Sequence, residues 1–304
     1  MFNWSGVGLL DRSTGRLRRI PNPANRRLCS PVFNPAGTQL ACLSGAAGHD
    51  LRGVALVDLS TGLVREVFGP ASAVLGYPIN NVLDVAVQPG TGHLLIARAP
   101  GLRAAYELLL LDPKQGVLQT ILPQEESARY LRNIQFIGPA EIIFQLDRSF
   151  RGRIAAEVAP LESDHFGPVN CRLRFGKTPR LLVPELERSP NPPFDNGDML
   201  SLAMARDGTV IGTSRRGVPG PGYATQVAQV DVAEQRLHYL TATPGVKNTV
   251  AIAADGGLVA FQSTDALVRG SAFFLWTLDR RDGALVRHDL LARLGADSHF
   301  FLPQ

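Results

Sequence analysis

Lysine and cysteine are scarce in this 304-residue chain, and charge of one sign is nowhere concentrated. Arginine supplies nearly all of the positive charge, and 31 basic residues against 27 acidic ones leave a net charge of +4. Because acids are interspersed with the short arginine pairs, the charge pattern does not indicate a nucleic-acid partner. The arginine pairs are Arg18-Arg19, Arg26-Arg27, Arg215-Arg216 and Arg280-Arg281.

Cys29, Cys42 and Cys171 do not have the spacing of a metal site, and we expect Cys29 and Cys42 to be buried thiols in strands. No apolar run reaches the length of a membrane span, which predicts no membrane insertion. The first residues, MFNWSGVGLL, have no basic segment followed by a long apolar run. This predicts no signal peptide and a cytoplasmic protein, or a periplasmic one if a leader has been trimmed away.

Catalytic motifs are also missing. The sequence has neither G-x-S-x-G nor H-E-x-x-H, and the six histidines are scattered without an obvious ligand set. Gly176-Lys177-Thr178 is similar to the end of a phosphate-binding loop, but Cys171 occupies the position of its first glycine. We therefore expect no cofactor, no bound metal and no catalytic residues.

A four-strand unit is repeated along the chain. In residues 29–68, apolar runs alternate with the turn Asn34-Pro35-Ala36-Gly37, a polar loop, and a hairpin turn from Asp58 to Gly62. The aspartate of such a turn accepts hydrogen bonds from the turn amides, and the glycine takes the left-handed conformation. A single sheet of this size cannot bury both faces, so copies must stack on one another.

The Asp-x-x-x-Gly turn marks the period of the repeat. Successive aspartates Asp11, Asp58 and Asp112 lie 47 and 54 residues apart, and Asp231, with Gln235 in the place of the glycine, lies 48 residues before Asp279. Four strands per period of this length are typical of a β-propeller blade. The alternative is a β-sandwich in which the turns coincide by chance.

The repeat resembles the WD-repeat-like blades of TolB-type propellers. Residues 30–37, SPVFNPAG, match the opening of that family's unit, with Phe33 in place of tryptophan and Ala36 in place of aspartate. Residues 56–62, LVDLSTG, match its second half. The other copies match mainly in their turns. The resemblance implies a propeller fold and, since TolB-type proteins are exported, differs from the cytoplasmic expectation.

The predicted fold is therefore all-β, a single β-propeller domain of six four-stranded blades over residues 1–304. The sixth blade combines the N-terminal hairpin with the C-terminal strand in a clasp, which leaves no free sheet edge. The predicted blades cover residues 4–20 with 296–304, 28–70, 80–123, 130–185, 197–243 and 247–291.

Polar residues recur just before the inner strands, where a propeller faces its central funnel. Convergent amides and charges at such positions can bind a small polar ligand or a peptide end. The structural alternative is that asparagine caps the turns before these strands. The funnel candidates are Arg27, Asn81, Asp84, Arg132, Asn133, Asp195, Asn196, Asp198, Lys247 and Asn248. Asp84, inside its strand, can instead hold the neighbouring blade.

Two groups of arginines are candidates for binding a partner. Arg148, Arg151 and Arg153 lie in the long connection of the 130–185 blade, and longer loops of a repeat often belong to its binding face. Arg215 and Arg216 form the second group. Both groups have a plainer interpretation as solvated loop or turn residues.

The sequence favours a non-catalytic scaffold that binds a protein or peptide through loops on one face. The alternative is a hydrolase or lyase acting on a small polar ligand in the funnel, with Asp84, Arg132, Asp195 and Asp198 as its residues. A third possibility is a metal-dependent propeller similar to lactonases, which needs carboxylates and amides around a hard cation. The oligomeric state is not determined by the sequence.

Overall fold

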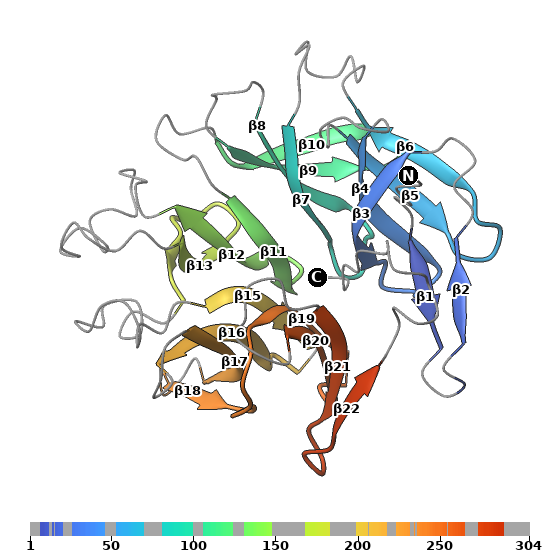
Figure 1. Cartoon of the computed structure of the whole chain (residues 1–304). Coiled ribbons are helices and arrows are strands. Elements are labelled where there is room, and N and C mark those ends of the chain that lie inside the picture. The colour runs from blue at the N-terminus through green and yellow to red at the C-terminus, as the bar shows by residue number, and fades with distance from the viewer. Residues whose placement is uncertain are drawn as a thin grey trace. The chain divides into compact units, whose positions relative to one another are not determined.

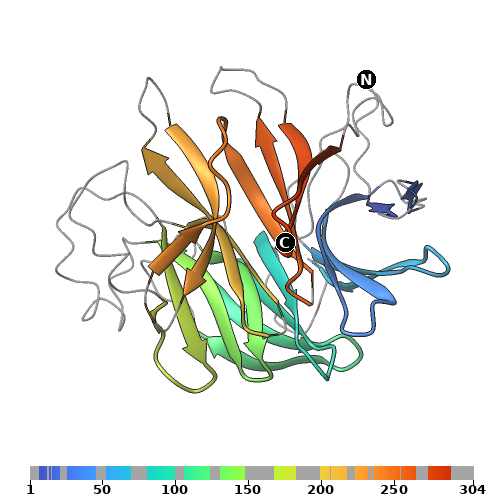
Figure 2. The same cartoon turned by 90° about the horizontal axis from the view of Figure 1, so that it is seen from below.

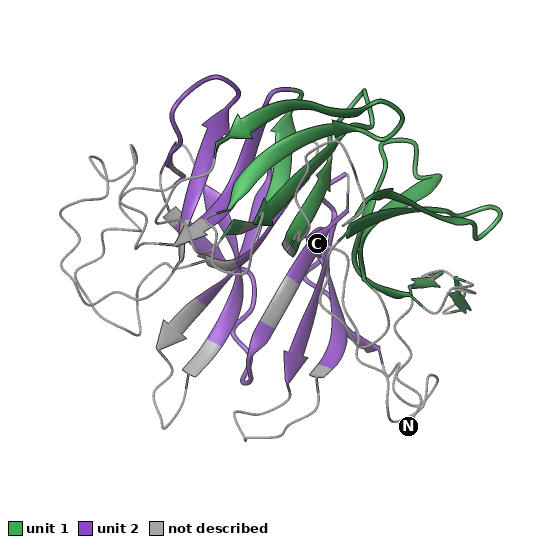
Figure 3. Cartoon of the chain, turned by 90° about the horizontal axis from the view of Figure 1, so that it is seen from above, with its two compact units in different colours: residues 1–139 green, residues 140–304 purple. Residues whose placement is uncertain are grey.

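The chain folds into antiparallel sheets of sequentially adjacent strands, as the computed structural model shows (Figure 1). The structure describes residues 7–11, 14, 16–20, 26–45, 53–69, 81–99, 106–123, 131–147, 168–182, 199–205, 207–217, 223–231, 234, 236–253, 255–264 and 273–288. It divides into two compact units, residues 1–139 and 140–304 (Figure 3).

The first unit contains a two-stranded hairpin and two four-stranded sheets, with strand orders β3-β4-β5-β6 and β10-β9-β8-β7. It also contains β11, the inner strand of a third sheet. The strands are β1 (Gly8–Leu10), β2 (Leu17–Arg19), β3 (Arg27–Phe33), β4 (Gln39–Gly45), β5 (Gly53–Asp58), β6 (Val64–Phe68), β7 (Asn81–Val87), β8 (Leu94–Ala99), β9 (Glu107–Asp112), β10 (Gly116–Leu122) and β11 (Leu131–Gly138).

The second unit completes the third sheet, whose order is β11-β12-β13-β14, and adds the sheets β15-β16-β17-β18 and β19-β20-β21-β22. These last two sheets lie side by side (Figures 1 and 2). The strands are β12 (Glu141–Asp147), β13 (Pro168–Arg174), β14 (Arg180–Leu181), β15 (Met199–Met204), β16 (Val210–Gly217), β17 (Tyr223–Asp231), β18 (Arg236–Tyr239), β19 (Lys247–Ile252), β20 (Leu258–Thr264), β21 (Phe273–Asp279) and β22 (Leu285–His288).

The described residues form five four-stranded sheets, which correspond to the five complete blades expected from the sequence. The expectation of six four-stranded blades is not met in the described residues, where the N-terminal copy is the two-stranded sheet of β1 and β2. The predicted partner of that hairpin, 296–304, lies outside the described residues. The organisation of 1–304 as one domain stays a prediction.

The turns have the chemistry that the repeat predicted. Asp58 Oδ1 accepts hydrogen bonds from the amides of Ser60 and Thr61 at 3.0 and 2.9 Å, and Gly62 closes the turn with φ 73°. The side-chain hydrogen bond from Ser60, with those from Thr61, lowers the pKa of Asp58 to about 2. Asp112 and Asp279 accept amide hydrogen bonds in the same way.

Both faces of the β3–β6 sheet are buried, which explains its continuous apolar runs. In the first unit, Leu43 and Phe68 pack with Val85 and Ile96 of the next sheet. The other face of the β3–β6 sheet packs against Val7 and other residues flanking the N-terminal hairpin. Apolar burial of this kind contributes roughly 1.5–3 kcal/mol for each large side chain.

A buried ion pair adds to this packing in the first unit. Arg98 in β8 is 1% exposed, and its Nε donates to Glu107 Oε1 in β9 at 2.8 Å. The guanidinium also lies over the Phe68 ring, 6.0 Å from its centroid. A buried charge requires such partners, because an unpaired guanidinium in this environment is strongly unfavourable.

Cysteine burial is as expected for Cys42 and differs for Cys29. Cys42 is fully buried, and this burial raises the pKa of its thiol to about 12, so the thiol is unreactive. Cys29 in β3 is half-buried. In the part of the chain that the structure describes, no helix has the length and apolar character needed to cross a membrane.

Candidate functional site

A bulge near the start of the inner strand recurs in several sheets. The strand register shifts between Val82 and Asp84 in β7 and between Met199 and Ser201 in β15. In β19 it shifts between Asn248 and Val250. A bulge twists its strand and redirects the following side chain. Asp84 and Ser201 therefore hold equivalent positions, directly after the bulge.

Asp84 uses this position to join two inner strands within the first unit. Its side chain is 2% exposed. Oδ1 accepts a hydrogen bond from the Val85 amide at 2.9 Å, and Oδ2 accepts one from the Ile134 amide in β11 at 2.8 Å. Asp84 is thus directed at backbone amides, as one of its two predicted roles requires; the ligand-binding role stays a prediction.

Ser201 makes the corresponding link in the second unit. Its hydroxyl accepts a hydrogen bond from the Val250 amide in β19 at 3.2 Å. The donor lies 49 residues after the acceptor here and 50 residues after it in the Asp84 link. The side chain after one bulge therefore satisfies a backbone amide in the next copy of the repeat.

Asn133 precedes Ile134 and is 4% exposed. Its φ of 56° is in the left-handed region, which asparagine tolerates better than most residues. This backbone conformation places the Ile134 amide toward Asp84. An asparagine at the start of an inner strand has a conformational role in this copy.

Lys247, at the start of β19, is buried with an exposed fraction of 0%. Its Nζ donates to the carbonyls of Thr243, Pro244 and Gly245 at 2.5, 2.7 and 3.4 Å. Burial lowers the pKa of this ammonium to about 8. Lys247 thereby closes the turn before its own strand.

Gly245 in that turn has no space for a side chain. Its φ is 94°, and an added Cβ would lie 1.9 Å from the Thr264 carbonyl oxygen. Thr225 in β17 fixes the backbone of Lys247, because its hydroxyl accepts a hydrogen bond from the Lys247 amide and donates one to the Lys247 carbonyl. The start of β19 is thus fixed by backbone contacts on several sides.

The other predicted positions are less closely defined. Arg27 in β3 is exposed. For Asn81 in β7, Arg132 in β11 and Asn248 in β19, the structure describes the backbone. Arg215 and Arg216 lie in β16, paired with Thr225 and Ala224 of β17. Asp195, Asn196, Asp198, Arg148, Arg151 and Arg153 lie outside the described residues.

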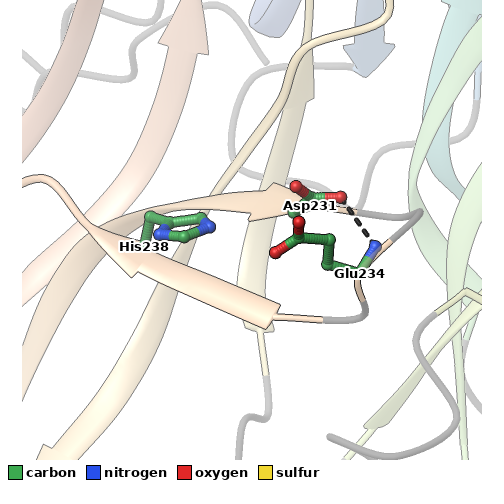
Figure 4. A group of neighbouring side chains, drawn as sticks. All are labelled: Asp231, Glu234 and His238. Atoms are coloured by element: carbon green, nitrogen blue, oxygen red, sulfur yellow. Dashed lines mark hydrogen bonds between the residues drawn. The ribbon is translucent and has the colours of Figure 1, made fainter.

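Three side chains that the sequence analysis did not group come together on the β17–β18 hairpin. They are Asp231, Glu234 and His238. One carboxylate oxygen from each acid and one imidazole nitrogen of the histidine lie within 4.8 Å of one another (Figure 4). Glu234 and His238 are exposed and Asp231 is half-buried. We call these residues the hairpin cluster.

The signal for the hairpin cluster was present in the sequence but incomplete. Asp231 was identified as the first residue of a turn, and a turn brings residues on either side of it together. The distance of seven residues from Asp231 to His238 does not reveal that they share a face. That depends on the pairing of Gln229 with His238, which the structure supplies.

Comparison with solved structures identifies the fold. TolB from Acinetobacter baumannii is 16% identical over 93% of this chain, with a TM-score of 0.61, and this chain spans 59% of that protein. A TolB assigned in Agrobacterium tumefaciens is 14% identical over 90% of this chain and 84% of its own, with a TM-score of 0.61. The expected resemblance to TolB-type propellers is confirmed: the chain has a β-propeller fold.

Enzymes share this fold. An oligogalacturonate lyase in complex with manganese is 15% identical over 93% of this chain and 71% of its own, with a TM-score of 0.56. No protein-family profile matches the sequence, and no curated protein matches it either. Because the same fold carries unrelated activities, function has to be argued from particular residues.

Replacing Asp84 tests its role as a link between strands. Asp84→Ala leaves the buried amides of Val85 and Ile134 without these acceptors, which should lower the free energy of unfolding by about 2–4 kcal/mol. Asp84→Asn keeps one oxygen and should cost less. Ser201→Ala, which affects one amide, is the matched variant and should cost about 1 kcal/mol. Urea unfolding measures all three, and an Asp84→Ala protein as stable as wild type would contradict the assignment.

Lys247 should make stability depend on alkaline pH. Its folded pKa of about 8 lies below the ordinary value of 10.5, so the unfolded chain binds more protons between these values. Stability therefore rises with pH across this window, by about 1–3 kcal/mol relative to Lys247→Met. Unfolding of both proteins at pH 7 and pH 10 measures the difference. An equal response in the two proteins would show that the ammonium is not destabilised by burial.

Proposed function

We propose that this protein is a non-catalytic β-propeller scaffold that binds a protein or peptide through loops on one face. One observation carries the proposal: buried polar side chains near the starts of inner strands are directed at the protein backbone. Both carboxylate oxygens of Asp84 accept hydrogen bonds from backbone amides, and the ammonium of Lys247 donates to three backbone carbonyls. A funnel enzyme needs such groups directed at its substrate.

The arginines are the proposed contacts with the partner. Arg215 and Arg216 lie in the last residues of β16, at the end of the hairpin with β17. Arginine is enriched at protein interfaces because its planar guanidinium donates several hydrogen bonds in a fixed geometry. Arg148, Arg151 and Arg153 complete the proposed set. The expected partner surface is acidic.

Exposed apolar residues provide further support. Leu285 and Val286, adjacent in β22, are 36% and 50% exposed, and Arg287 after them stacks over Phe274 with 4.5 Å to the ring centroid. The outermost strand of this sheet thus presents apolar and cationic groups together. Exposed groups of this kind are common in protein interfaces.

The second candidate is a hydrolase or lyase acting on a small polar ligand in the funnel. It is favoured by the fold shared with the manganese-bound oligogalacturonate lyase. Arg132, Asp195 and Asp198 would then act with other residues at the strand starts. The burial of Asp84 is the observation that places this candidate second.

We also propose that the propeller has six blades. The β1–β2 hairpin would be the outer half of the sixth blade, and 296–304 would supply an inner strand beside it. Val7 and Ile20, which flank the hairpin, are already packed on the β3–β6 sheet.

Deletion of 296–304 tests the sixth blade. The truncated chain should melt several degrees lower, because it would lose the strand that completes the sixth blade. For a domain of this length, such a shift corresponds to about 1–2 kcal/mol. Calorimetry of the full and truncated chains gives the comparison. The same melting temperature for both would refute the clasp.

Affinity capture from the native lysate tests the scaffold proposal. Wild-type chain should retain a stoichiometric protein, and Arg215→Glu/Arg216→Glu should lose it because the charge reversal repels an acidic surface. Arg18→Glu/Arg19→Glu makes the same charge change in β2 and should retain the partner.

Asp195→Ala/Asp198→Ala tests the funnel in the same experiment. If this variant loses the partner and the arginine variant keeps it, the partner binds at the strand starts. Absence of any stoichiometric protein, together with cleavage of oligogalacturonate that Asp195→Ala/Asp198→Ala abolishes, would replace the scaffold proposal by the enzyme.

A further inference from the structure

We propose that the hairpin cluster of Asp231, Glu234 and His238 is a binding site for a divalent transition-metal ion, with Zn²⁺ as the best-matched ion. The site lies on the β17–β18 hairpin of the second unit and shares no residue with the predicted funnel. It is independent of the proposed partner binding. Three side-chain ligands would leave further coordination positions for water or for a donor atom of another molecule.

Strand register places two of the three ligands on one face. His238 pairs directly with Gln229, and Asp231 lies two residues after Gln229 in β17. Residues opposite one another share a face of an antiparallel pair, and so do alternate residues of one strand. Asp231 and His238 are therefore diagonal neighbours on the same face of the hairpin.

The turn adds the third ligand. The amide of Glu234 donates a hydrogen bond to Asp231 Oδ1 at 2.8 Å, which fixes the backbone of Glu234 next to the aspartate. The Glu234 carboxylate then lies between Asp231 and the His238 ring (Figure 4). A pairing specific to this turn thus brings a second carboxylate to the imidazole.

The donor set indicates the kind of ion. Sites made only of oxygen ligands suit Mg²⁺, Ca²⁺ and Mn²⁺, whereas an imidazole nitrogen shifts the preference toward Zn²⁺, Ni²⁺ and Cu²⁺. Zn²⁺ imposes no geometry of its own from d electrons, which suits ligands from a strand pair and a turn. Two carboxylates also balance the double charge of the ion.

The distances are compatible with coordination after a small closure. Donor atoms around tetrahedral Zn²⁺ are separated by about 3.4 Å, since each bond is about 2.1 Å long. The donor atoms of the hairpin cluster are within 4.8 Å, and Glu234 and His238 are exposed, so rotation of their side chains can close the gap.

A cation lies near the hairpin cluster. Arg280 Nη2 donates to Gln229 Oε1 at 2.7 Å, beside the cross-strand position of His238. This guanidinium opposes the approach of a metal ion, and the ionised carboxylates of Asp231 and Glu234 offset the repulsion. Removal of one carboxylate charge should therefore weaken binding strongly, even when the side chain keeps its shape.

Titration of the full chain with Zn²⁺ alone, followed by calorimetry, tests the site. Wild type should bind one equivalent, and Glu234→Gln and His238→Gln should each lose at least about tenfold in affinity, since even the loss of an outer-shell partner commonly has that effect. Asp231 is left unchanged because it caps the turn. Circular dichroism should show that both variants are folded.

His93→Gln is the matched control. His93 Nε2 lies 3.8 Å from Asp112 Oδ2, so this histidine has one carboxylate neighbour in place of two. The control should bind Zn²⁺ as wild type does. Co²⁺ loading gives a second readout, because its visible absorption depends on the geometry and ligand field at the ion, which the loss of the imidazole in His238→Gln changes. The proposal is overturned if wild type takes up no Zn²⁺ at millimolar concentration, or if either cluster variant binds as tightly as wild type.

Discussion

The inner strands β3, β7, β15 and β19 each bear a bulge, and buried backbone amides that the strand ladder leaves unpaired need other acceptors. Asp84 supplies one for β11, and Ser201 supplies one for β19. The acceptor belongs to the preceding copy of the repeat, so hydrogen bonding and apolar stacking connect the same neighbours. A sheet with both faces buried, such as β3–β6 between the N-terminal hairpin and β7–β10, is stable only in such a stack.

This constraint limits what the interior can do. Side chains that satisfy buried amides and carbonyls are held in fixed positions, and they would leave unpaired groups behind if they turned to a ligand. Lys247 shows the same restriction with the opposite charge, since its ammonium closes a turn in which Gly245 has no room for a Cβ. Rigid strand starts of this kind suit a scaffold that presents loops and edges.

The exposed hairpins are where neighbouring copies differ chemically. Asp58, Asp112 and Asp279 cap equivalent turns, but only the turn at Asp231 is described with a glutamate and a histidine beside its aspartate. A turn that already carries a carboxylate for structural reasons needs two further side chains to become a metal site. This is a small change in sequence, and it leaves the packed strands untouched.

The sequence by itself determined the repeat, because turn chemistry is local. Aspartate and glycine at fixed spacing favour a hairpin turn, so the spans of the five sheets and the positive φ at Gly62 and Gly283 followed from the turn motifs. The tertiary structure decided which side chains face one another. The contact of Asp84 with Ile134 crosses 50 residues, and that of Asp231 with His238 depends on strand register. Neither is local, since a shift of one residue in register would turn each side chain to the other face.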